Sequence, residues 1–103
     1  MRSRGFAAWC GLAAILSCIG CHQPSAESGA ALFRKNCVAC HSLLPGHAQH
    51  GPSLRGYFER SPRPGVGQAR KAILGGGPFM PLFRGRLSPD EVDDLIAYMR
   101  TLR

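Results

Sequence analysis

The chain has 103 residues, which is enough for a single domain and excludes a multidomain enzyme. Thirteen Lys or Arg residues against six Asp or Glu residues give a formal net charge of +7. A basic balance of this size bears on the choice of partner and on association rates, and it leaves the fold open.

The first 20 residues have the pattern of an export signal. Arg2 and Arg4 precede residues 5–20, which carry no charged side chain and include an apolar run over 6–19. A permanent membrane span needs roughly 20 apolar residues, so this run is too short for one. We therefore expect an exported protein, and in an exported protein the positive charge does not indicate a nucleic-acid partner.

At the end of the apolar run, Cys18 and Cys21 each follow a small residue. This arrangement resembles the lipobox of bacterial lipoproteins, in which the cysteine becomes the lipidated first residue after cleavage. Cys21 is the preferred site and Cys18 the second. The alternative is an ordinary signal peptide cut near Ala26, because both classes of signal are cleaved beside small residues.

The expected organisation follows from this start. We expect a signal peptide over residues 1–20, a linker over 21–27 and one domain over 28–103. The mature protein then lies on the periplasmic side of a bacterial membrane, held by lipid at Cys21 or, with an ordinary signal, soluble in the periplasm. A domain of about 80 residues buries a limited core and often needs a disulfide, a metal or a cofactor.

A helix is predicted over residues 25–36. Its alanine and leucine residues favour helix, and its charges complement the helix dipole. Glu27 lies in the first turn, whereas Arg34 and Lys35 lie near the end.

Residues 42–67 contain repeated glycine and proline and no alternation of β-branched residues. This composition indicates loop, with one helical turn over 54–58. Residues 68–74 form a short helix candidate that ends at the three glycines 75–77.

The final helix has the clearest start. Ser88, Pro89 and Glu91 suit the N-cap, the first helical position and the capping box. Apolar residues then recur at helical spacing, at Val92, Leu95, Ile96, Met99 and Leu102. Such an apolar face needs a partner, and the helix around Phe33 is the natural one. The sequence therefore predicts an all-α fold in which two terminal helices pack together with loops between them.

Residues 37–41 read Cys-Val-Ala-Cys-His, which is the pattern of covalent haem attachment. Cys37 and Cys40 can add their thiols to the two vinyl groups on one edge of the porphyrin. His41 follows the second thiol directly, which places it under the iron as a ligand, a usual role of histidine in haem proteins.

Residues 18–22 match the same pattern, with Cys18, Cys21 and His22. This copy straddles the expected cleavage site, so cleavage before Cys21 destroys it, and it has no domain around it. We therefore expect one haem, attached at residues 37–41.

Met80 is the expected second ligand of the iron. It lies in residues 75–83, where glycines let the backbone approach closely and flanking prolines keep the segment out of helix. Met1 is the initiator, and Met99 belongs to the apolar face of the last helix, where a methionine fills the core. Ligation by histidine and methionine raises the reduction potential of haem iron.

From about Ser28 to Leu102 the chain resembles a class I cytochrome c of the small bacterial monohaem kind. The matching features occur in order along the chain, at Gly29, Phe33, 37–41, 51–54, 79–81 and 95–102. The resemblance implies the cytochrome c fold, with Gly29 and Phe33 packed against Tyr98. It also implies that the Pro52 carbonyl binds the ring N–H of His41 and orients this ligand.

The resemblance further implies a one-electron carrier without catalytic residues, which exchanges electrons with a dehydrogenase, an oxidase or another cytochrome. The side chains expected to exclude water from the haem are Leu32, Leu54, Phe79, Leu82 and Leu95. Four basic residues bracket the Met80 segment, either as solvated charges or as a rim that docks an acidic partner or holds haem propionates: Arg70, Lys71, Arg84 and Arg86.

Three other interpretations use the same residues. A zinc site could be formed by two cysteines and two histidines, Cys37, Cys40, His47 and His50, although the six residues between Cys40 and His47 depart from the usual spacing of about 12. The two cysteines could form a redox dithiol, which is normally housed in a strand–helix–strand unit that is not predicted here. A haem iron without Met80, left open or bound by His47 or His50, would suit peroxide or gas chemistry.

Overall fold

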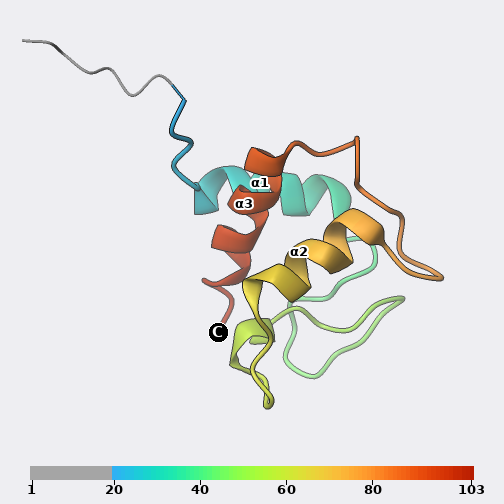
Figure 1. Ribbon diagram of the computed structural model, residues 1–103. Helices are drawn as coiled ribbons and strands as arrows, with labels where there is room; N and C mark the ends of the chain where they lie inside the picture. The colour runs from blue at the N-terminus through green and yellow to red at the C-terminus, as the bar shows by residue number, and fades with distance from the viewer. Residues whose placement is uncertain (1–19) are drawn as a thin grey trace, which may run out of the picture.

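The structure is a computed structural model that describes residues 20–103, so the predictions for 1–19, Cys18 included, lie outside the described residues. The described part contains three α-helices and one 3-10 turn, and its only β pairing is an isolated bridge between Arg84 and Leu87. In order the elements are α1 (Ala26–Asn36), η1 (Tyr57–Glu59), α2 (Val66–Gly75) and α3 (Pro89–Met99). The all-α prediction is confirmed, and α1 and α3 cross where Gly29 meets Asp94 (Figure 1).

Both terminal helices begin as predicted. Ser25 caps α1 by accepting the backbone N–H of Ser28 at 3.2 Å. At the start of α3, the Ser88 hydroxyl accepts from the Glu91 N–H at 3.1 Å, and the Glu91 carboxylate accepts from the Ser88 N–H at 2.7 Å. These reciprocal contacts form a capping box that satisfies two N–H groups left free at the start of a helix.

The middle of the chain differs from the prediction in detail. Helix α2 begins at Val66, two residues earlier than expected, because Val66 packs against the core and extends the apolar face. It ends at Gly75, and the capping residue Gly76 has a φ of +63°, a conformation that suits glycine. The expected turn over 54–58 is present as η1, shifted slightly along the chain.

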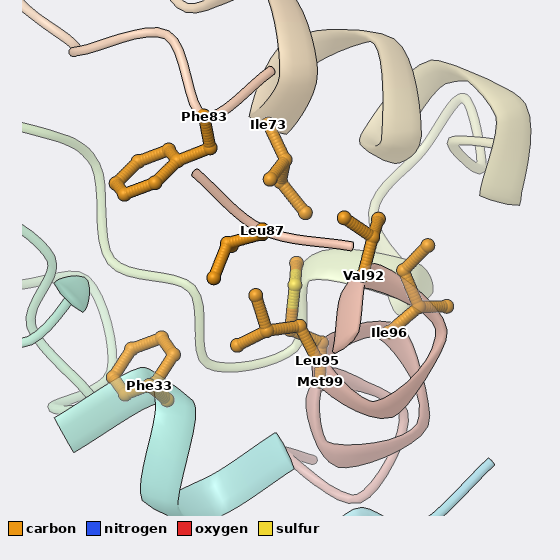
Figure 2. Packing of buried hydrophobic residues seen from close by; sticks show 8 residues of the cluster. All are labelled: Phe33, Ile73, Phe83, Leu87, Val92, Leu95, Ile96 and Met99. Atoms are coloured by element: carbon orange, nitrogen blue, oxygen red, sulfur yellow. The ribbon is translucent and has the colours of Figure 1, made fainter. Parts of the chain in front are cut away.

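The core lies between the three helices and the segment that joins α2 to α3. Figure 2 shows Phe33 of α1 facing Leu95 of α3, with Phe83 and Leu87 from the connecting segment beside them. The rings of Phe33 and Tyr98 lie 5.5 Å apart between centroids, so the predicted contact between these helices is confirmed. Within residues 20–103, no helix combines the length and apolar character that crossing a bilayer requires.

Candidate haem site

A cavity of about 230 Å³ opens at the C-terminal end of α1. Three separate parts of the chain line it, namely residues within 36–41, residues 50–52 and residues within 77–83. Cys37, Cys40 and His41 come from the first part and Met80 from the third. The four side chains that the sequence analysis assigned to the haem therefore meet around a single cavity.

The two thiols are positioned by the turn that follows α1. The N–H groups of Cys40 and His41 donate to the Cys37 carbonyl at 3.1 and 2.9 Å, which winds residues 37–41 tightly. Both thiols are half-buried and neither is in a disulfide. Burial raises the pKa of the Cys37 thiol to about 11, and the neighbouring Cys40 adds to this rise.

The imidazole of His41 is fixed by the segment across the cavity. Its Nδ1 lies 2.8 Å from the carbonyl oxygen of Pro52. A carbonyl can only accept, so Nδ1 carries the proton and Nε2 keeps its lone pair. Gly51 lies flat against the same ring, and a Cβ at this position would stand 2.5 Å from Cε1 of His41. The ring is thus held in the tautomer that a metal ligand requires.

Met80 is delivered by a short loop that is closed on itself. The N–H of Gly77 donates to the Met80 carbonyl at 3.0 Å, and the N–H of Phe83 donates to the carbonyl of Ile73 in α2 at 3.2 Å. Met80 is half-buried and packs against the core. The loop therefore contributes Met80 to the lining of the cavity, together with the 50–52 segment.

The expected apolar shell is correct in part. Leu95 is buried, and Leu32 and Leu54 pack against the core. Phe79 and Leu82 are 92% and 56% exposed, and Phe79 lines the mouth of the cavity, so their part in excluding water stays a prediction.

Phe83 was not among the residues expected in the apolar shell, yet it lies in that shell. Its side chain is 4% exposed and lines the cavity. The sequence offered a weak signal, because Leu82 and Phe83 are adjacent apolar residues and only one can face inward. The loop conformation, which local patterning does not reveal, decides which one does.

The donor set of the cavity fits a covalently attached haem. Two thiols, a histidine nitrogen with a free lone pair and a thioether lie around largely apolar walls, and these groups can attach a haem c covalently and ligate its iron. Within residues 20–103, no three His, Cys, Asp or Glu side chains are grouped as a metal site needs, so the zinc alternative lacks support. The raised pKa of Cys37 also disagrees with a redox dithiol, whose thiol pKa is lowered.

His22, from the copy of the attachment motif at residues 18–22, contacts acidic side chains of α3. Nε2 of His22 lies 2.8 Å from a carboxylate oxygen of Asp94 in α3, and its Nδ1 lies 3.9 Å from Asp90. Both ring nitrogens therefore face carboxylates, and the geometry offers neither to a second haem.

The four basic residues around the Met80 loop have different surroundings. Arg70 forms an ion pair with Asp93 across α2 and α3, so its charge is already engaged within the fold. The Arg86 guanidinium lies 5.2 Å from the ring centroid of Phe83, and Arg84 and Lys71 are exposed. Of these four residues, Arg84 and Arg86 lie nearest in sequence to the cavity lining.

Comparison with known proteins agrees with this geometry. Residues 24–99 match the family described as "Cytochrome C oxidase, cbb3-type, subunit III". A cytochrome c-553-like protein of Synechocystis sp. is 34% identical over 77 residues, which cover 75% of this chain and 69% of that protein. Cytochrome c6 of Limnospira maxima is 30% identical over 77 residues, which cover 70% of this chain and 86% of that protein. A crystal structure of cytochrome c6 from the diatom Phaeodactylum tricornutum matches with a TM-score of 0.59 and 27% identity, over 75% of this chain and 92% of that one.

Proposed function

The chain belongs to the cytochrome c family, as a class I monohaem electron carrier with one covalent haem c, and from that premise we propose which residues hold the haem. Cys37 and Cys40 attach the porphyrin, and His41 and Met80 ligate the iron. The observation that carries this assignment is the convergence of all four side chains, from two separate segments, on one cavity. When bound, the haem supplies a one-electron couple between Fe(II) and Fe(III).

The protein contributes orientation, ligand basicity and exclusion of water. The Pro52 carbonyl keeps the proton on Nδ1 of His41, so that Nε2 remains a ligand and gains basicity. The thioether of Met80 favours the reduced iron and raises the potential. Phe83, which is buried and lines the cavity, keeps water away from its inner side.

The setting of this activity is also proposed. The export signal over residues 1–20 and the lipobox-like cysteine support a periplasmic protein with a lipid anchor at Cys21. Its partners are redox proteins, and the exposed Arg84, with Arg86 beside it, suits a partner with an acidic docking face. Electron exchange with such a partner is expected to slow as salt concentration rises, because exposed charges are screened within about 10 Å at 0.1 M salt. A rate that does not change with salt would contradict the basic rim.

The absorption spectrum tests the ligand assignment. Sulfur bound to ferric iron gives a weak band near the red end of the spectrum, so we expect this band in the wild type and its loss in Met80→Ala. Met99→Leu is the matched control, since Met99 is buried in the core outside the cavity lining. The assignment fails if the wild-type band is absent or if it survives in Met80→Ala.

The second candidate function is peroxide or gas chemistry at an iron without Met80. One observation favours keeping it, because His50 lines the same cavity and could supply a second imidazole. The same spectra decide, since a wild type that lacks the red band and changes its spectrum in His50→Ala would have histidine at both axial positions.

A further inference from the structure

The segment that leads into α1 is bound to α3 through one buried carboxylate. Asp94 is 6% exposed, and a single oxygen of its side chain accepts from Nε2 of His22 at 2.8 Å and from the Ser25 backbone N–H at 2.7 Å. The His22 ring also faces Asp90 at 3.9 Å. Asp90 and Asp94 are four residues apart, one helical turn, so the imidazole lies between two carboxylates of the same helix face.

The charges around His22 favour its protonated form. Five of the six acidic residues of the chain lie in the first two turns of α1 and α3: Glu27, Asp90, Glu91, Asp93 and Asp94. The hydrogen bond to Asp94 raises the pKa of His22 above its usual value of 6.5, and the charges of Asp90, Asp94 and Asp93 add to the rise. From α1 and its cap, the group that reaches the same carboxylate is the Ser25 N–H.

This contact lies at the end of the domain remote from the cavity. The chain enters α1 at Ala26, whereas the cavity begins at Asn36, the other end of the helix. An α-helix of 11 residues is about 16 Å long, so the two ends are well separated. Figure 1 shows the N-terminal segment leaving from the end of α1 opposite to the loops that carry residues 50–52 and 77–83.

We propose that His22, held between Asp94 and Asp90, is a proton-dependent clamp that fixes the segment next to Cys21 against α3, on the end of the domain remote from the haem cavity. With the imidazole charged, Cys21 is one residue from a fixed point on the domain. With the imidazole neutral, the nearest remaining attachment is Ser25. Residues 22–24 are then free to extend, and at up to 3.6 Å per residue they let Cys21 move roughly 10 Å farther from the domain.

The clamp has a consequence for an anchored protein. If the bilayer holds Cys21, the N-terminal ends of α1 and α3 in the clamped domain lie near the membrane. The cavity then faces away from the membrane, toward soluble partners. Release lets the domain tilt and bring the cavity closer to the bilayer. This consequence rests on the proposed lipid anchor and haem site, whereas the clamp itself needs neither.

Nuclear magnetic resonance on the reduced, haem-loaded protein from residue 21 tests the clamp. We expect the His22 ring to titrate above 6.5 and backbone residues 22–24 to be ordered at about pH 6 and mobile at about pH 8.5. His22→Gln should leave residues 22–24 mobile at both pH values, and His47→Gln, a change in an exposed loop, should behave as wild type. Asp90→Asn should lower the titration midpoint while leaving the buried Asp94 intact.

Two results would overturn the clamp. One is mobility of residues 22–24 in the wild type at about pH 6. The other is a His22→Gln variant in which the order of residues 22–24 depends on pH as strongly as it does in the wild type. The red band of the same sample, recorded after oxidation, reports the Met80 ligand separately, so failure of the clamp and failure of the haem assignment are told apart.

A vesicle experiment tests the consequence for orientation. The haem-loaded protein is coupled through Cys21 to a maleimide lipid in phosphatidylcholine vesicles that carry a headgroup fluorophore. At about pH 6 the haem should quench this fluorophore less in the wild type than in His22→Gln, because the clamp holds the cavity away from the bilayer. Equal quenching would contradict the orientation, even where the clamp itself is observed.

Discussion

Gly29 of α1 lies directly against the backbone carbonyl of Asp94 in α3, where the two helices cross. A Cβ at Gly29 would stand 1.9 Å from that carbonyl oxygen and 2.8 Å from the Cβ of Tyr98. The missing side chain lets the helices approach closely enough for the ring of Phe33 to pack on Tyr98. The crossing therefore fixes the direction of α1, and with it the position of the haem-binding turn at its end.

Gly29→Ala is expected to destabilise the fold strongly. The added methyl group overlaps backbone atoms that cannot move without separating the helices, and overpacking of this kind costs about 1–3 kcal/mol, occasionally more. Denaturant unfolding of the haem-loaded protein measures the effect. Gly67→Ala in α2 is the control, since a Cβ there meets nothing within 4 Å and alanine favours helix by about 0.5–1 kcal/mol. Equal stability of the two variants would contradict the close crossing.

Gly51→Ala is expected to disturb the iron ligand. Its Cβ would displace the His41 ring and weaken the hydrogen bond from Nδ1 to the Pro52 carbonyl. A less basic imidazole stabilises ferric iron less, so the reduction potential should rise, with a loss of stability of about 1–3 kcal/mol. Redox titration beside Gly65→Ala, where a Cβ meets nothing within 4 Å, checks this prediction. An unchanged potential in Gly51→Ala would mean that the contact does not tune the ligand.

Ser88→Ala removes the cap of α3 and is expected to cost about 1 kcal/mol of folding free energy. Glu91→Ala removes the reciprocal contact to the Ser88 N–H. Because the two side chains form one capping box, the double variant should lose less than the sum of the single losses. Thermal unfolding of the four proteins measures this coupling, and strictly additive losses would show that the two contacts act independently.

The contact between His22 and Asp94 predicts a pH-dependent contribution to stability. The pKa of His22 is raised in the folded protein above its usual 6.5, first by the hydrogen bond to Asp94. The contribution is therefore complete below 6.5 and is lost as the pH rises through the folded pKa. Unfolding of wild type and His22→Gln across this range should differ at low pH and converge at high pH. A difference that grows with pH would reverse the sign and contradict the account.

Features with a local cause were predictable from the sequence. The capping box at Ser88, the apolar face from Val92 to Met99 and the attachment motif at 37–41 each depend on residues close together in the chain, and all three have the expected local form or spacing. The packing of Phe33 on Tyr98 could be predicted only from the family resemblance, because neither segment alone indicates which residue it contacts.

Features that depend on long-range geometry were not predictable in the same way. Phe79 and Phe83 look equally apolar in the sequence, yet one is 92% and the other 4% exposed, because the turn around Met80 decides which of the two rings enters the core. In the sequence, His22 is only part of the second copy of the attachment motif, beside the expected cleavage site. Its contact with Asp94 spans 72 positions, so only the folded crossing of α1 and α3 reveals it.

The intact mass of the exported, purified protein tests the central claim most directly. We expect the mass of a chain that begins at Cys21, plus acyl groups and one haem. The haem should be retained under denaturing conditions, because thioether bonds to Cys37 and Cys40 hold it. Replacing both cysteines by alanine should remove this added mass. A wild-type protein that carries no covalent haem, or two, would contradict the assignment of a single haem to residues 37–41.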